Sequence, residues 1–220
     1  MNFFAHGIRF LDEPYFLVGT AIPDMLSVAD RKVRMRSRLV EPHVDGSGSE
    51  VDLVARGVLQ HLNDDDWFHT TLPFYDLSGK LSLMFRELQP PSDKFYPGFL
   101  GHIVTEMLLD AVLIEQFPGK IEQYYHAFEE IEPGKIEEVV NLMGTRQTDR
   151  LAPLIPRFSH ERFLEDYLDL SKMLYRLNQV MRRVTLAPLP DETVELLIEM
   201  KIMVERNWRG LLPEDRFVIT

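Results

Sequence analysis

Apolar residues recur every three or four positions along most of this chain, and prolines or glycines separate the segments that show this spacing. Such periodicity predicts amphipathic α-helices. The expected helices span residues 51–71, 73–88, 98–116, 120–131, 135–143, 163–183 and 191–208. The chain shows neither the alternation typical of β-strands nor an internal repeat with a period of about 20–50 residues. The pattern therefore predicts one all-α domain, a helical bundle.

Proline, glycine and serine mark the expected boundaries between elements. The pair Pro90-Pro91 should end the helix over residues 73–88, because proline cannot continue a helix. Residues 44–50 are rich in glycine and serine and should form an exposed loop. Near the N-terminus, Pro14 interrupts an apolar stretch, and Ser27 is expected to cap a short helix.

Two of the predicted helices carry a polar stripe on an otherwise apolar surface. In each stripe, histidine and acidic residues recur every fourth position. The stripes consist of His61, Asp65 and His69, and of His102, Glu106 and Asp110. Residues four apart lie on one face of a helix. Because buried charged groups are costly unless they are paired or bound to metal, the two stripes predict a metal site.

The composition narrows the chemistry of such a site. The chain has 220 residues, enough for one substantial domain, and it has no cysteine, so a metal would be held by imidazole and carboxylate groups. The net charge of −11 argues against broad nucleic-acid binding. No apolar run approaches the roughly 18 residues that span a bilayer, and no signal peptide is evident. A cytoplasmic protein without a membrane span is therefore expected.

Helix geometry limits which residues can share one ion. Four residues of helix rise about 6 Å and eight rise about 12 Å, whereas metal–ligand bonds are roughly 2.0–2.2 Å long. His61 and His69 should therefore not share an ion, and neither should His102 and Asp110. The stripes suit two ions roughly 3.5–4 Å apart, or one ion with neighbouring catalytic groups. Manganese, zinc and iron all bind imidazole and carboxylate well, so the identity of the divalent metal stays open.

Short blocks in the first half of the chain resemble the acyl-carrier-protein phosphodiesterase family, an atypical branch of the HD phosphohydrolases. M-N-F-F-A-H, residues 1–6, is similar to the family's opening, and G-T-A-I-P-D, residues 19–24, resembles its Gly-Asn-x-x-x-Asp block. Residues 57–69 resemble the block Gly-x-x-x-His-x-x-x-Asp-x-x-x-Asp. E-M-L-L-D, residues 106–110, resembles the block Asp-x-x-x-Asp.

The chain also departs from the family pattern. Leu62-Asn63 stand where the family has an Arg-Arg pair, and His69 and Glu106 stand where it has aspartates. No adjacent His-Asp dyad of the ordinary HD type is present. The substituted ligand positions keep ligand character, so the resemblance carries metal binding over better than it carries the substrate. The added imidazoles of His69 and His102 make the set more similar to zinc-dependent phospholipase C.

The resemblance implies an HD-like helical domain and a metal-dependent phosphodiesterase, in which one or two ions activate water to attack a phosphodiester. The candidate metal ligands are His6, Asp24, His61, His69, His102, Glu106 and Asp110. Asp65 is expected to act as the base or as a carboxylate behind the ligands, and Asp24 occupies a position that the family needs for activity. Residues 1–117 should form the metal-site half, and residues 118–220 the half that packs against it and shapes the substrate cleft.

One strongly basic segment lies between residues 31 and 38. Its charged residues are Arg31, Lys32, Arg34, Arg36 and Arg38. They could attract phosphate or an acidic partner such as acyl carrier protein. Equally, they could form a solvated basic loop that balances the acidic surface.

Three other interpretations fit the same residues. A phospholipase-C-like or nucleotide phosphohydrolase would use the same metal site on a different phosphoester. A non-catalytic helical protein could keep the metal for stability or sensing. In a purely structural module, the stripes would be solvated or would pair with Arg86, Arg146 or Arg182.

Overall fold

The computed structural model describes residues 1–88 and 95–219, and within them the chain forms helices and no β-strand. This confirms the predicted all-α class. The α-helices are α1 (Phe3–Gly7), α2 (Pro14–Ala29), α3 (Ser37–Val40), α4 (Glu50–Phe68), α5 (Leu72–Leu88), α6 (Pro97–Gln116), α7 (Lys120–Glu129), α8 (Pro133–Met143), α9 (Leu151–Glu161), α10 (Leu170–Arg183) and α11 (Thr193–Leu211). Two 3-10 helices are η1 (Glu41–His43) and η2 (Phe163–Leu168).

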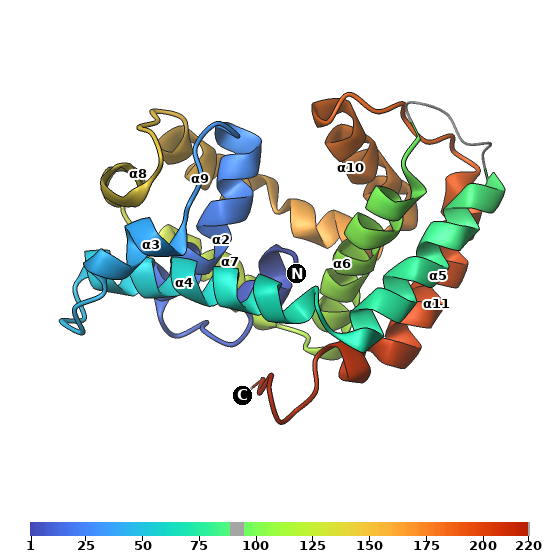
Figure 1. Ribbon diagram of the computed structural model, residues 1–220, viewed down its shortest axis with the longest axis horizontal. Helices are drawn as coiled ribbons and strands as arrows, with labels where there is room; N and C mark the ends of the chain where they lie inside the picture. Colours follow the sequence, from blue (N-terminus) through green and yellow to red (C-terminus); the bar gives the residue numbers. More distant parts are fainter. Residues whose placement is uncertain (89–94, 220) are drawn as a thin grey trace.

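The helices form two groups that flank the N-terminus (Figure 1). One group holds α2, α3, α8 and α9, and the other holds α5, α6, α10 and α11. α4 runs from the first group toward the second and packs extensively against α2. The short helix α1 contacts α2 on one side and α6 on the other. The N-terminal segment is therefore the place where residues from both groups can meet.

α2 and α4 cross at two glycines. A Cβ atom on Gly57 would lie 2.1 Å from the carbonyl oxygen of Phe16, and one on Gly19 would lie 2.6 Å from the carbonyl oxygen of Val54. Both distances are far shorter than a van der Waals contact, so the two backbones can approach this closely only where neither residue has a side chain. The next residue after Gly19 is Thr20, and the close crossing brings its carbonyl oxygen to the ring of His61 on α4.

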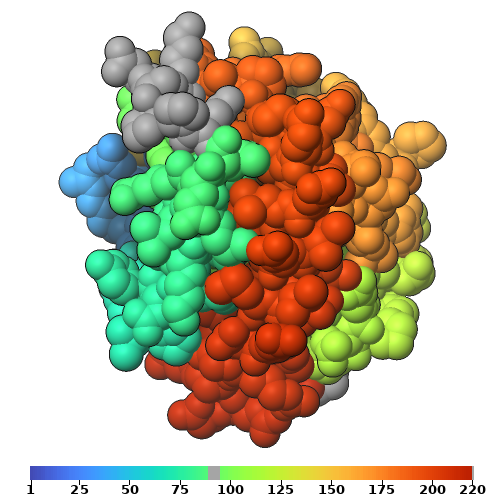
Figure 2. Space-filling view, turned by 90° about the vertical axis from the view of Figure 1, so that its right-hand side faces the viewer, coloured from blue at the N-terminus to red at the C-terminus, as the bar shows by residue number. Residues whose placement is uncertain are grey.

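α6 is the central helix of the second group. All of its residues from Val104 to Ile114 are buried, including Glu106 and Asp110. α6 packs against α5 and α11, which lie side by side on the outer face of the molecule (Figure 2). Among the described helices, α6 alone is long and apolar enough to cross a membrane, and 72% of its most apolar window is buried inside the protein, as in a core helix.

Most of the predicted helices are confirmed. α4, α5, α6, α7, α8 and α11 match expected segments, with ends that differ by a few residues. The glycine- and serine-rich stretch forms a loop before α4. The backbone N–H groups of Asp45, Gly46 and Gly48 in this loop donate hydrogen bonds to the carboxylate of Asp52 in the first turn of α4. The helix break expected at Pro90-Pro91 lies outside the described residues.

The prediction of one helix over residues 163–183 is wrong. η2 ends at Leu168 and α10 begins at Leu170. Asp169 between them has an extended backbone, and its carboxylate accepts hydrogen bonds from the backbone N–H groups of Ser171 and Lys172. An aspartate with these contacts caps a new helix. The apolar spacing conceals this break because apolar residues continue at helical intervals on both sides of it.

The periodicity does not predict α2 or α9. Pro14 stands at the start of α2, where a helix tolerates proline, and Pro23 lies inside it. Ser27 also lies inside α2 and donates its hydroxyl to the carbonyl oxygen of Asp24, so its expected role as a helix cap is wrong. α9 likewise contains Pro156. In both helices, packing against the rest of the protein outweighs the low helix propensity of proline.

Replacing Gly57 by alanine should lower the free energy of unfolding by about 1–3 kcal/mol, the usual cost of overpacking. Gly79 of α5 provides a matched control, because a Cβ atom there meets nothing within 4 Å. Gly79→Ala should leave stability unchanged or raise it by up to about 1 kcal/mol. Urea unfolding measures both effects, and equal stabilities of the two variants would contradict the close crossing of α2 and α4.

Candidate metal centre

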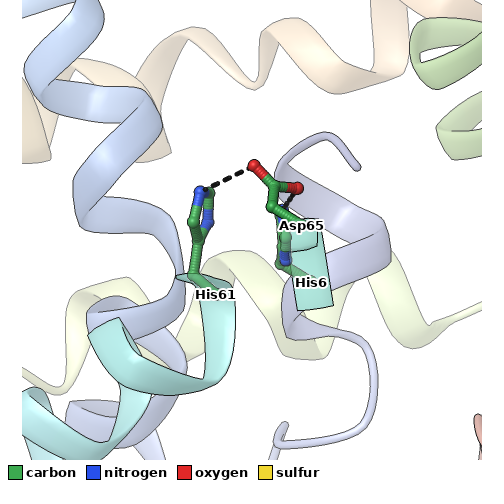
Figure 3. A group of neighbouring side chains, drawn as sticks. All are labelled: His6, His61 and Asp65. Atoms are coloured by element: carbon green, nitrogen blue, oxygen red, sulfur yellow. Dashed lines mark ion pairs between the residues drawn. The ribbon is translucent and has the colours of Figure 1, made fainter. Parts of the chain in front are cut away.

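α1 and α4 together bring two histidines and an aspartate into contact. His6 lies on α1, and His61 and Asp65 lie one turn apart on α4. The Asp65 carboxylate points at both rings (Figure 3), with Oδ1 3.2 Å from His6 Nε2 and Oδ2 3.5 Å from His61 Nε2. The two imidazoles stack with their ring centroids 3.9 Å apart. One ligand atom from each residue lies within 4.8 Å of the others, so this first group could hold a metal ion.

The ring of His61 is oriented by α2. His61 Nδ1 lies 2.8 Å from the carbonyl oxygen of Thr20. A carbonyl oxygen only accepts hydrogen bonds, so Nδ1 carries the hydrogen. The other ring nitrogen, Nε2, faces Asp65 Oδ2 at 3.5 Å. Histidines that bind metal usually donate their other N–H group in this way, often to a backbone carbonyl.

His6 is buried without a hydrogen bond. Both of its ring nitrogens are enclosed, and neither makes a hydrogen bond of good geometry with a described residue, although Nε2 lies 3.2 Å from Asp65 Oδ1 and Nδ1 lies 3.9 Å from Asp64 Oδ2. Leaving a buried polar group unsatisfied costs about 1–3 kcal/mol. A cation bound by His6 would give one of these nitrogens a partner, which is a physical reason to expect a ligand here.

Asp110 of α6 anchors the helix that carries His6. Its Oδ1 accepts a hydrogen bond from the N–H of Ala5 at 2.8 Å, and its Oδ2 accepts one from the N–H of Phe4 at 3.1 Å. These N–H groups belong to the first turn of α1, where a helix offers them no acceptor of its own. Burial raises the pKa of Asp110 to about 7, although both hydrogen bonds oppose this rise.

A second group of ligand-type side chains adjoins the first. It consists of His69, which follows the last residue of α4, and of His102 and Glu106, one turn apart on α6. Glu106 Oε1 lies 2.7 Å from His69 Nε2 and 3.2 Å from His102 Nε2. Glu106 is buried, whereas both rings are partly exposed. This second group could also hold an ion.

The amino group of Met1 lies between the two groups. Its nitrogen is 2.6 Å from Asp65 Oδ1 and 3.1 Å from Glu106 Oε1. Burial lowers the pKa of this ammonium, but the two carboxylates outweigh burial and raise the pKa to about 10. Burial would also raise the pKa of Asp65 and Glu106, yet the ammonium and the neighbouring imidazoles bring both below their usual range. Positive charge is thus strongly stabilised where the groups meet.

Asp24 of α2 lies beside the two groups without joining either. Its Oδ2 is enclosed and makes no hydrogen bond with any described residue. Burial raises the pKa of Asp24 to about 7, and the charges of Asp65 and Glu106 add to this rise against the opposing effect of His61. Asp24 is therefore partly protonated near neutral pH.

A cavity of about 560 Å³ opens onto this arrangement, and Asp24 and Glu106 line it. Its walls come from α2, α6, α9, η2 and α10. Apolar side chains in these walls include Met25, Ile103, Met107, Leu154 and Phe158. A cavity of this size suits a small organic molecule. The second half of the chain thus contributes to the walls of a cleft beside the polar groups of the first half.

The structure brings most of the predicted site residues together. The two groups contain His6, His61, Asp65, His69, His102 and Glu106. His61 and His69 belong to different groups, as helix geometry predicts. Asp65 occupies a ligand position, and its low pKa makes it a weak base. Asp24 and Asp110 lie nearby but in neither group, so their metal binding stays a prediction.

The predicted basic segment lies outside the cavity. Its residues Arg31, Lys32, Arg34, Arg36 and Arg38 are all exposed, and none lines the cavity wall. Arg31 Nη1 donates a hydrogen bond to the carbonyl oxygen of Arg183, and Arg183 lines the cavity. The segment therefore borders the cavity at one point, and its binding of phosphate or a partner stays a prediction.

Within the described residues, the side chains of the two stripes do not pair with the arginines that the structural alternative names. None of their ion pairs joins Arg86, Arg146 or Arg182 to a stripe residue. Arg9 pairs with Asp64, whose Oδ2 also lies 3.9 Å from His6 Nδ1. Most stripe residues instead contact one another or the Met1 ammonium, and Asp110 accepts hydrogen bonds from the backbone of α1.

Sequence reasoning misses the arginines of the cavity. Arg150, Arg157, Arg176 and Arg183 all line it. The last two stand seven residues apart on α10, a spacing of about two turns that places them on one face. That signal is present in the sequence, whereas nothing local shows that α9 and α10 face the same cavity.

The donor set fits a divalent metal. Imidazole and carboxylate ligands suit manganese, zinc and iron alike, and the absence of sulfur ligands does not select among these metals. The His6 nitrogens lack hydrogen bonds of good geometry, and the Met1 ammonium is held between two carboxylates, so both observations point to a cation at this place. His6, His61 and Asp65 would hold one ion, and His69, His102 and Glu106 a second.

Replacing Asp110 by alanine should destabilise the protein by about 2–4 kcal/mol, because the N–H groups of Phe4 and Ala5 would lose their buried acceptor. Asp110→Asn keeps one acceptor oxygen and should cost less. If Asp110 only positions α1, the folded Asp110→Asn protein should bind Zn²⁺ within a few-fold of the unmodified affinity in calorimetric titrations. A loss of tenfold or more would identify Asp110 as a ligand.

Comparisons with protein-family models, with curated proteins and with solved structures return no match to this chain. The resemblance to the acyl-carrier-protein phosphodiesterase family therefore rests on the sequence blocks alone, and the HD-like type of bundle stays a prediction.

Proposed function

We propose that this protein is a metal-dependent phosphodiesterase of the HD-like type. The observation that carries the proposal is the meeting of two groups, each with two imidazoles and one carboxylate, beside a cavity of about 560 Å³. Two adjoining sites of this composition suit the hydrolysis of phosphoric esters, in which two ions bind the attacking and the leaving oxygen. The sequence blocks that resemble acyl-carrier-protein phosphodiesterases support the same chemistry.

The metal ligands and Asp24 have different roles in the proposed reaction. A metal held by the two groups supplies positive charge that polarises a phosphoryl oxygen and activates water as a nucleophile. Asp24 Oδ2 accepts a proton from the attacking water, since this atom is enclosed, lacks a partner and belongs to a carboxyl group whose pKa is about 7. Asp65 is a weaker candidate for this role because its pKa is held below the usual range.

Acyl carrier protein is the substrate that the family resemblance suggests. Its acidic surface would complement the exposed basic segment from Arg31 to Arg38, which touches the residue Arg183 at the cavity. A nucleotide or a phospholipid headgroup could be cleaved by the same metal centre. Phosphopantetheinylated carrier protein and a panel of chromogenic phosphodiesters distinguish these substrates by their kcat/KM.

Metal content and turnover test the proposal together. The purified protein should bind up to two equivalents of Mn²⁺, Zn²⁺ or Fe²⁺ in elemental analysis, and the loaded protein should hydrolyse bis(4-nitrophenyl) phosphate. His61→Ala should remove one equivalent and lower kcat/KM at least about 100-fold, because a ligand is lost. His160 of α9 is an exposed histidine outside both groups, so His160→Ala serves as the control.

Two results would decide against this function. A protein that binds no metal, and is not stabilised by any of the three ions, has no such centre. A protein that binds metal tightly but hydrolyses neither the chromogenic diesters nor phosphopantetheinylated carrier protein is instead a non-catalytic metal-binding protein.

Replacing Asp24 by asparagine should lower kcat by about 10²–10⁴ with metal content unchanged, because the side chain keeps its shape but no longer accepts a proton. Asp12, an exposed aspartate outside the cavity, provides the control Asp12→Asn. Steady-state kinetics and elemental analysis on the same preparations separate the two possible roles. A parallel loss of metal and activity would make Asp24 a ligand rather than the base.

A further inference from the structure

The cavity is basic on two facing sides. Arg150 precedes α9 and Arg157 lies on it, whereas Arg176 and Arg183 lie on α10. α9 and α10 belong to the two different groups of helices that flank the N-terminus (Figure 1). The lining also contains the carboxyl groups of Asp24 and Glu106 beside the metal centre and that of Glu161 on α9. Away from the metal centre the guanidinium groups therefore outnumber the carboxyl groups, which indicates that this part of the cavity receives negative charge.

The arginines differ in how their charge is compensated. Arg176 is held by Asp166, which accepts from its Nε at 2.7 Å, and Arg157 makes an exposed contact with Glu161 at 3.3 Å. Arg150 and Arg183 form no ion pair with any described residue. Partial desolvation lowers the pKa of Arg183, and the neighbouring charge of Arg176 adds to this effect. Arg150 and Arg183 are therefore the two guanidinium groups best able to bind an anion.

The cavity changes character from its inner end to its mouth. Glu106 at the metal centre is buried, whereas Arg150, Arg157 and Arg183 are exposed, so the arginines lie at the solvent side. Apolar side chains such as Ile103, Met107 and Leu154 line the same cavity. A molecule that fills it would meet a cation-binding centre at one end, apolar walls, and guanidinium groups at the other end.

We propose that Arg150 and Arg183 form an anion site at the mouth of the cavity, which binds a phosphate group of the substrate other than the one that reacts. This inference rests on the proposed function for the identity of the reacting group. The substrate class is then a phosphodiester whose longer arm is uncharged near the reacting phosphorus and ends in a second phosphate. Guanidinium groups suit this role because their paired N–H donors match the oxygens of phosphate.

Binding to the metal-free protein tests the anion site independently of catalysis. Calorimetric titration with inorganic pyrophosphate at constant ionic strength should show saturable binding. The double variant Arg150→Gln/Arg183→Gln should weaken this binding at least tenfold. Arg146→Gln/Arg182→Gln removes the same charge from exposed arginines outside the cavity and should change the affinity less than threefold. Thermal unfolding confirms that each variant is folded.

Kinetics on the metal-loaded protein test the link to the substrate. For an aryl phosphodiester whose other arm ends in a phosphate monoester, the Arg150→Gln/Arg183→Gln variant should raise KM at least tenfold and leave kcat within about twofold. For bis(4-nitrophenyl) phosphate, which lacks a second phosphate, KM should not change. A purely structural role of the arginines would affect both substrates equally.

The binding experiment and the kinetic experiment distinguish failure of the anion site from failure of the proposed function. Equal pyrophosphate affinities of the unmodified protein and the Arg150→Gln/Arg183→Gln variant would overturn the anion site, and so would an equal loss in the control variant. Tighter binding of tricarballylate than of pyrophosphate would show that the site selects carboxylates and would overturn the assignment to phosphate. Selective pyrophosphate binding without turnover of any diester would support the anion site while the proposed phosphodiesterase function fails.

Discussion

The close crossing of α2 and α4 is the constraint on which the candidate site depends. Gly19 and Gly57 let the two backbones touch, and the carbonyl oxygen of Thr20 consequently reaches the ring of His61. That hydrogen bond fixes the hydrogen on Nδ1 and leaves Nε2 free to face Asp65. The same helix then carries Asp24, one turn beyond Thr20, to the edge of the cavity. A side chain at either glycine would push the two helices apart and so change the orientation of the His61 ring, although His61 itself would remain.

Charge balance explains how so many polar side chains can share the interior. Asp65 and Glu106 stay ionised because the Met1 ammonium and the imidazoles around them lower their pKa. Both oxygens of Asp110 accept hydrogen bonds from N–H groups of α1, which fixes the helix that carries His6. Asp65 on α4 and Glu106 on α6 are therefore positioned by two different helices around one place of positive charge. A divalent ion at that place would interact with them more strongly than a single ammonium, because Coulomb energy scales with charge.

The stripes could be predicted because a four-residue interval is a local property of the chain, and the histidines and acids of each stripe do share a helix face. The contact between the stripes could not be predicted in this way, since it depends on how α4 and α6 pack. His6 entered the prediction only through the family resemblance, because nothing in its own surroundings distinguishes it from a core histidine. A cleft shaped by the second half of the chain is predicted, but its walls could not be assigned to particular helices. Prolines obscure the periodicity of α2 and α9, and these two helices supply much of the wall.

The wrong prediction of a single helix over residues 163–183 concerns the element that shapes the mouth of the cavity. In a continuous helix, Asp166 and Arg176 would lie ten residues apart, about 15 Å along the axis, and could not form an ion pair. The break at Asp169 lets α10 turn back on η2, so that Arg176 Nε reaches Asp166 Oδ2 at 2.7 Å. Arg176 is thereby held in the cavity wall with its charge largely compensated, which leaves Arg183, two turns further along α10, as the uncompensated guanidinium of that wall. The helix break that periodicity conceals thus determines which arginine is available to an anionic ligand.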